Sequence, residues 1–170
     1  HNNIDYAYYM RAICYYEQIK NEYLDGNFNQ KALENFNQII NRFPESKYAR
    51  DSEQKIILIK ENIAAKHMDI ALFYLKQKKY LAAMKRYQQV VNDHFKSKFI
   101  PEALHRLVEI YYLLGMKEDA KKTASVLGYN YPNSKWYKYS YELVGPKDEN
   151  KNKKISFFGK LSNLLTKNNE

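Results

Sequence analysis

Among the side chains of this 170-residue chain that could act as a nucleophile, a general base or a metal ligand, the least common are one cysteine and four histidines. His67, His94 and His105 lie on separate stretches, and none has a second histidine and a glutamate at the spacing of an H-E-x-x-H zinc motif. The 5 glycines are scattered and form no phosphate-binding loop, and no serine stands in a G-x-S-x-G turn. We therefore expect a protein that is not an enzyme and that holds no metal ion and no cofactor.

Cys14 and His67 are the two residues whose neighbours come nearest to supporting acid–base or covalent chemistry. Cys14 stands between Ile13 and Tyr15 on an apolar stretch, which predicts a buried structural thiol, and a lone cysteine forms no disulfide within the chain. His67 is two residues from Asp69, but side chains at positions i and i+2 of a helix point apart. Neither residue predicts nucleophilic catalysis.

The net charge of +9 comes mostly from lysine, since lysines outnumber arginines 23 to 5. Nucleic-acid surfaces cluster arginine for bidentate contacts, whereas here lysine and glutamate alternate as on solvent-exposed helices. We expect no nucleic-acid partner. The sequence shows no signal peptide, no lipidation motif at its first residue and no bilayer-spanning apolar run. It begins directly before a helical pattern, which indicates a fragment of a longer protein.

A Ser-Lys-aromatic motif occurs three times, at offsets of 51 and 37 residues, each copy following an aromatic or aromatic-proline stop. The copies are Ser46-Lys47-Tyr48, Ser97-Lys98-Phe99 and Ser134-Lys135-Trp136. An internal period in this range is typical of stacked helical repeats.

The segments between the motifs read as pairs of helices. Residues 101–132 show apolar steps of three and four, a break at Gly115 and a stop at Pro132, and Ala120 is small enough for close helix packing. The same template fits residues 64–95, with Ala83 in place of Ala120, and a third copy ends at Pro44. The chain is therefore predicted to be all-α, a tetratricopeptide-like α-solenoid of about three stacked antiparallel helix pairs. One helix should run through residues 48–78.

The 17 tyrosines divide between packing and surface positions. Four of them fall on the buried stripe of the repeats: Tyr15, Tyr74, Tyr87 and Tyr111. Three fall off that stripe and are expected at the surface: Tyr6, Tyr9 and Tyr16.

Residues 1–145 are predicted to form the repeat domain, and residues 146–170 a basic linker and a short amphipathic tail. Ile155, Phe158, Leu161 and Leu165 recur at helical spacing, but so short a helix is marginal by itself. Three alternatives remain open for this tail. It could be disordered, it could dock on a partner subunit or an anionic membrane, or it could dock on this molecule or a neighbouring one. We favour the last.

Several segments, in order, resemble the BamD family of outer-membrane protein assembly lipoproteins. They are DYAYYMR at 5–11, RFPESKYA at 42–49, FYLK at 73–76, YLAAMKR at 80–86, EAL at 102–104 and NYPNS at 130–134. The similarity covers residues 1 to about 143, which would be the C-terminal three of five repeats. The chain departs from the family at Gln77-Lys78, where Arg-Gly is usual, and at Phe95-Lys96, where an aromatic-proline stop is usual.

The resemblance implies a non-catalytic scaffold at the periplasmic side of the outer membrane, held by a lipid anchor outside this fragment. It implies binding to the last POTRA domain of the barrel-forming insertase BamA, membership of the assembly machinery with its other subunits, and contact of missing N-terminal repeats with unfolded outer-membrane proteins. Arg86 matches the family arginine that pairs with an acidic POTRA residue, and it is expected to be exposed. The full set of expected partner-binding residues is Arg86, Lys85, Gln89, Lys76, Gln77 and Lys79.

Two other classes remain open. One is a generic repeat adaptor or chaperone that binds a peptide or partner protein, in which Arg86 is an ordinary surface residue. The other is a basic module for nucleic acid or a membrane surface, which steep salt dependence of binding would reveal.

Overall fold

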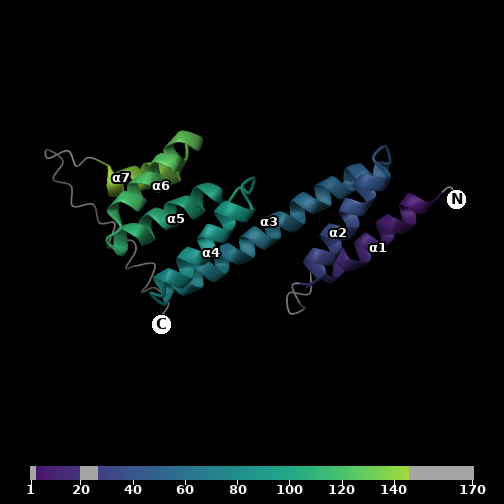
Figure 1. The fold of residues 1–170 in the computed structure, drawn as a ribbon, viewed down its shortest axis with the longest axis horizontal. Helices are drawn as coiled ribbons and strands as arrows, with labels where there is room; N and C mark the ends of the chain where they lie inside the picture. The colour runs from purple at the N-terminus through teal and green to yellow at the C-terminus, as the bar shows by residue number, and fades with distance from the viewer. Residues whose placement is uncertain (1–2, 20–26, 146–170) are drawn as a thin grey trace. The chain divides into compact units, whose positions relative to one another are not determined.

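The computed structural model describes residues 3–19 and 27–145, which form seven α-helices and contain no β-strand (Figure 1). In chain order they are α1 (Ile4–Ile19), α2 (Asn27–Arg42), α3 (Lys47–Lys76), α4 (Tyr80–Asp93), α5 (Ile100–Leu113), α6 (Lys117–Asn130) and α7 (Lys135–Val144). The predicted all-α fold is confirmed. The chain divides into two compact units, residues 1–65 and 66–170.

In the first unit, α1 packs antiparallel on α2 (Figure 1). Small and aliphatic side chains around Phe36 form its core, which consists of Ala12, Ala32, Phe36, Ile39, Ala49 and Ile59. Tyr9 and Tyr16 pack against this core rather than facing solvent, so their predicted surface position is wrong. The α1 face that meets Phe36 is wider than a single stripe. Tyr6 is 46% exposed, as expected.

Cys14 is exposed, which contradicts the predicted buried thiol. The reason is helical geometry. Ala12 is the fully buried residue of α1, and a residue two positions further along is turned by about 200°, onto the opposite face. The apolar neighbours Ile13 and Tyr15 made the position look buried in sequence, although they flank the core side of the helix while Cys14 does not.

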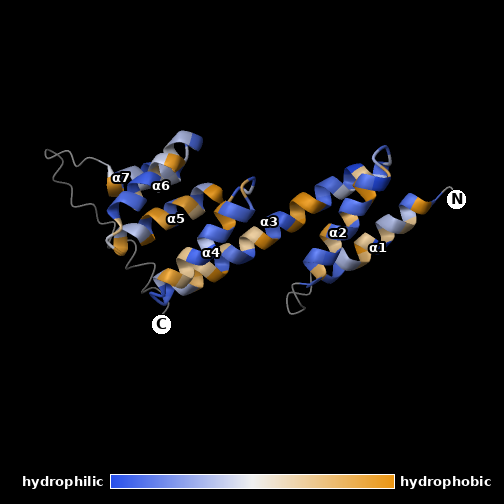
Figure 2. Cartoon of the chain, in the orientation of Figure 1, coloured by the Kyte–Doolittle hydropathy of each residue, from blue (hydrophilic) through white to orange (hydrophobic). Residues whose placement is uncertain are grey.

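In the second unit, α5 is the central helix. It contacts α4, α6 and α7, and eight of its residues are buried. Figure 2 shows it as a largely hydrophobic helix between more polar ones. Ala83 on α4 and Ala120 on α6 are both fully buried, as the repeat template requires. α7 is an additional helix, packed on α5 and α6.

The turns that follow α3 and α5 have the same geometry, 37 residues apart. Lys78 has φ 58° and Gly115 has φ 77°, both in the left-handed region. The next amide in each turn bonds back across the helix end, Lys79 to the carbonyl of Tyr74 and Met116 to that of Tyr111, at 2.9 Å in both cases. The left-handed Lys78 explains why α3 ends at Lys76, two residues before the predicted end.

The Ser-Lys-aromatic motif forms a turn at or just before the start of a helix, and Ser134 is the N-cap residue of α7. In each copy the serine Oγ accepts a hydrogen bond from the amide of the aromatic residue two positions on, at 3.2 Å in all three. The lysine Nζ lies over the aromatic ring, 4.8 to 5.2 Å from its centroid. The hydroxyl thus satisfies an amide that a helix or turn start leaves unpaired, a contribution of about 1 kcal/mol.

Candidate partner-binding site

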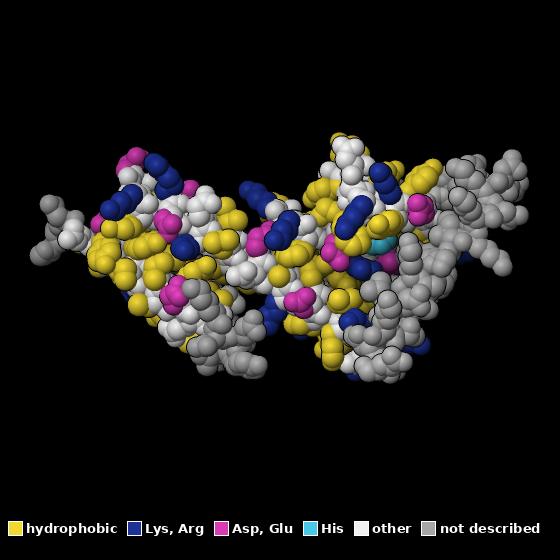
Figure 3. All heavy atoms as spheres, turned by 180° about the vertical axis from the view of Figure 1, so that it is seen from behind, with side chains coloured by type: hydrophobic (Ala, Val, Ile, Leu, Met, Phe, Trp, Pro, Cys, Tyr) yellow, Lys and Arg dark blue, Asp and Glu magenta, His cyan; other side chains and the backbone are white. Residues whose placement is uncertain are grey.

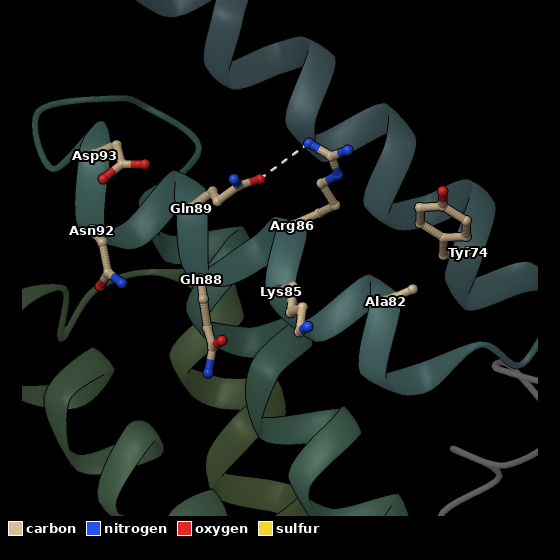
Figure 4. Close-up of a pocket in the computed structure, with 8 residues that line it drawn as sticks. All are labelled: Tyr74, Ala82, Lys85, Arg86, Gln88, Gln89, Asn92 and Asp93. Carbon is tan, nitrogen blue, oxygen red and sulfur yellow. Dashed lines mark hydrogen bonds between the residues drawn. The ribbon is translucent and has the colours of Figure 1, made fainter.

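A hollow of about 520 Å³ lies beside α4 in the second unit. Its lining is polar and comes mainly from one face of α4, with one tyrosine from α3, as Figure 4 shows: Tyr74, Ala82, Lys85, Arg86, Gln88, Gln89, Asn92 and Asp93. Positions 82, 85, 86, 89, 92 and 93 follow one another at steps of three, one, three, three and one, which places them on one helix face. The lining contains two cationic groups and one acid.

Arg86 is the residue of this hollow that is best placed to bind a carboxylate. Its Nη1 donates to the Gln89 Oε1 at 3.2 Å and lies 3.4 Å from the His67 Nδ1 (Figure 4 draws the first of these bonds). Both interactions use Nη1, so within the described part of the chain the Nε–Nη2 edge makes no hydrogen bond. That edge can donate two parallel bonds to one carboxylate. Arg86 is half-buried rather than exposed, because it lies against α3.

The structure brings together only half of the residues expected to bind a partner. Lys85, Arg86 and Gln89 line the hollow, and Lys85 and Gln89 are exposed. Lys76, Gln77 and Lys79 are exposed at the turn between α3 and α4 and do not line it. Five lining residues were not in the expected set: Tyr74, Ala82, Gln88, Asn92 and Asp93. Helical spacing would have found Asp93, seven residues from Arg86, and Asn92, seven residues from Lys85.

Gln88 connects the hollow to the following repeat by a hydrogen bond. Its Nε2 donates to the Tyr111 hydroxyl at 3.0 Å, which links α4 to α5. Tyr111 also packs against the core of α5 and α6, as predicted, and Tyr87 is buried in the same unit. The face of α4 that lines the hollow is therefore held on a rigid support.

His105, Ser140 and Glu109 form a second cluster, which resembles a catalytic triad in its connections. The His105 Nδ1 lies 2.8 Å from the Ser140 Oγ, and its Nε2 lies 3.2 Å from the Glu109 Oε1. A nucleophile must reach its substrate, yet the three side chains are 0 to 3% exposed. The cluster instead fastens α7, which carries Ser140, to α5.

Glu109 is the charged centre of this cluster. Burial pushes the pKa of Glu109 upward, but the hydrogen bond from His105 and the charge of Arg106 outweigh it, so the pKa lies below its usual value. The Arg106 Nη1 donates to the Glu109 Oε2 at 2.9 Å, and the Arg106 guanidinium lies over the ring of Trp136. Sequence reasoning missed this network because its members are spread from residue 105 to residue 140.

Among the described residues no group of three histidine, cysteine or acidic side chains could hold an ion. The rings of His67 and His94 do meet, with centroids 6.0 Å apart, although the sequence places them on different segments. No helix in the described part of the chain is both long and apolar enough to cross a membrane.

Charge on the visible surface is mixed. The face drawn in Figure 3 places basic and acidic side chains among apolar ones instead of gathering the basic ones into one stripe. Antiparallel helices built on a repeating template, with a polar hollow on one repeat, define a helical-repeat binding protein.

Comparison with known proteins gives this class a family. A family model described as outer membrane lipoprotein, YfiO, matches residues 1–127. The chain is 46% identical over 144 residues to the outer membrane protein assembly factor BamD of Rickettsia prowazekii, covering 84% of this chain and 57% of that protein. It is 40% identical to the BamD of Caulobacter vibrioides, over 82% of this chain and 46% of that protein. The chain belongs to the YfiO family of outer membrane lipoproteins, and the resemblance found in the sequence is confirmed. It spans about half the length of these curated relatives.

Proposed function

We propose that this chain is part of a non-catalytic scaffold of the machinery that assembles outer-membrane β-barrel proteins. Its relatives carry the name outer membrane protein assembly factor, and the family is one of outer membrane lipoproteins. In this proposal the protein works at the periplasmic side of the outer membrane, held by a lipid anchor outside this chain, and joins other subunits of the machinery. Repeats outside this chain would engage unfolded outer-membrane proteins.

The hollow around Arg86 is the surface that we assign to the POTRA domain of the insertase BamA. The observation that carries this assignment is the Nε–Nη2 edge of Arg86, which makes no hydrogen bond among the described residues while Nη1 is held by Gln89. A half-buried, fixed guanidinium edge fits an aspartate or glutamate side chain on a partner. Lys85 adds positive charge beside it, which speeds the encounter with an acidic surface.

Lys76, Gln77 and Lys79 take a peripheral place in this proposal. They lie on the turn beside the repeat that carries the hollow and are exposed. Solvent-exposed charges at the rim of an interface change the association rate and its salt dependence more than the affinity. We assign them to the rim.

The test is the affinity of the chain for the last POTRA domain of BamA from the same organism, measured by calorimetry. Arg86→Glu places a negative charge against the partner's carboxylate and should weaken binding about tenfold or more. Arg50→Glu is the matched control, because Arg50 is exposed in the first unit and should leave the affinity unchanged. Both variants should melt at the wild-type temperature. Unchanged binding by Arg86→Glu, or a loss of fold that accompanies weak binding, would refute the assignment.

A peptide-binding adaptor is the second candidate, and the amide side chains of the hollow favour it. Gln88, Gln89 and Asn92 could bond the backbone of an extended peptide. The two candidates separate by competition. An acidic peptide that binds the hollow as tightly as the folded POTRA domain would favour the adaptor, whereas binding of the folded domain alone would favour the scaffold.

A further inference from the structure

His67 contacts Arg86 of the candidate site and has no role in the function proposed above. It is half-buried on α3, and its Nδ1 is 3.4 Å from the Nη1 of Arg86 on α4. An arginine has only donors, so the ring nitrogen in this contact must be the acceptor, with its lone pair toward Nη1. The hydrogen of the ring is then on Nε2.

The groups around His67 favour this neutral form. Burial lowers the pKa of His67, and the charge of Arg86 lowers it further. His94, whose ring centroid is 6.0 Å away, and Lys66 act in the same direction, while Asp93 opposes them. Near neutral pH the ring is therefore uncharged and can accept a hydrogen bond at Nδ1.

The two acceptors match both hydrogens of the Arg86 Nη1. Nη1 carries two hydrogens, and its two neighbours are the Gln89 Oε1 at 3.2 Å and the His67 Nδ1 at 3.4 Å. Gln89 lies one helical turn along α4 from Arg86, whereas His67 belongs to α3. A guanidinium held from two different helices has its plane fixed, which a single bond from the same helix would not do.

We propose that His67 is a positioning residue for Arg86, which fixes the guanidinium plane so that the Nε–Nη2 edge is presented to a partner's carboxylate. The effect on partner binding rests on the proposed function, but the contact between His67 and Arg86 is present in the chain without a partner. A fixed donor edge binds a carboxylate without first losing side-chain freedom, and the gain in affinity comes from that. His67 itself touches no partner.

The first test uses the free protein and needs no partner. The titration of His67 is followed by NMR in the wild-type chain and in Arg86→Gln, and the His67 signal is assigned among the four histidines by its loss in His67→Gln. Removal of the arginine charge should raise the pKa of His67. A His67 titration that is the same with and without Arg86 would overturn the inference, whatever the partner does.

The second test measures affinity for the BamA POTRA domain at pH 7.5. His67→Ala removes the acceptor and should weaken binding about twofold to tenfold, the worth of one hydrogen bond. His67→Gln offers an amide oxygen and should bind more tightly than His67→Ala. His94→Gln is the matched control, since His94 makes no hydrogen bond with Arg86, and should bind like wild type.

A double-mutant cycle separates positioning from a general structural effect. In an Arg86→Gln background, His67→Ala should cause no further loss of affinity, because nothing remains to be positioned. An equal loss in both backgrounds, or no recovery by His67→Gln, would overturn the inference. If the POTRA domain binds none of the chains, the proposed function fails and the titration alone decides the role of His67.

Discussion

The equivalent turns after α3 and α5 allow a stability prediction in which Lys78 is compared directly with Gly115. Lys78 and Gly115 occupy the same left-handed position, yet one has a side chain and the other does not. The left-handed conformation costs a residue other than glycine about 1–2 kcal/mol. Glycine in turn loses about 0.5–1 kcal/mol more conformational entropy on folding. The difference predicts that Lys78→Gly stabilises the second unit by about 0.5–1 kcal/mol.

Gly115→Ala should have the opposite effect, a loss of about 0.5–1 kcal/mol. A Cβ added at Gly115 would meet no heavy atom within 4 Å, so the change is purely a backbone effect. Lys79→Gly is the control for the first variant, since Lys79 has φ −83° and gains nothing from glycine. It should destabilise.

The assay is urea unfolding followed by the fluorescence of Trp136, the only tryptophan of the chain, which lies on α7 in the second unit. A change of about 0.5–1 kcal/mol should move the urea midpoint by about 0.2–1 M, because the unfolding free energy of a small protein falls by about 1–3 kcal/mol per M of urea. The reasoning is refuted if Lys78→Gly and Gly115→Ala shift the midpoint in the same direction, or if Lys78→Gly behaves like Lys79→Gly.

Two further predictions concern the packing of α5. Ala120→Leu should destabilise the second unit by about 1–3 kcal/mol, because Ala120 is fully buried in the core of α5 and α6 and an extra three carbons overfill it; urea unfolding measures this, and a neutral result would contradict the close packing. The pKa of Glu109 lies below its ordinary value of 4.5 in the folded chain, so its stabilising contribution is present above that pH and is lost as the pH falls through the folded value. Urea midpoints between pH 7 and pH 3 should therefore decline less steeply in Glu109→Gln than in wild type, and equal slopes would show that the carboxylate is not the group concerned.

The sequence was sufficient for the helices because the repeat template fixes their spacing and ends. Gly115, Pro132 and the buried Ala83 and Ala120 all lie where periodicity placed them. Lys78 shows the limit of that reasoning, since a lysine by itself gives no sign that its backbone is left-handed, and only the glycine usual at this position in the resembling family pointed to it. The end of α3 at Lys76 was therefore established only by the structure.

The candidate site was predicted in part, for a related reason. Arg86, Lys85 and Gln89 share one face of α4, which helical spacing reveals. His67 is 19 residues away, and its contact with Arg86 depends on how α3 and α4 meet. The exposed Cys14 and the half-buried Tyr9 show the same limit. The apolar neighbours of Cys14 suggested a buried position, and the repeat stripe suggested a surface position for Tyr9, although Tyr9 packs against the core.

The three serine turns also bear on how the chain folds. Each of them joins residues only two positions apart, so its formation closes almost no loop and needs no tertiary contact. The slow step for any helix is its first turn, after which growth takes nanoseconds per residue. Turns at or just before the starts of α3, α5 and α7 can form in the unfolded chain and favour the first turn of each helix there. These three helices can then begin to form without tertiary contacts, whereas the other helices of the described residues depend more on packing against their neighbours.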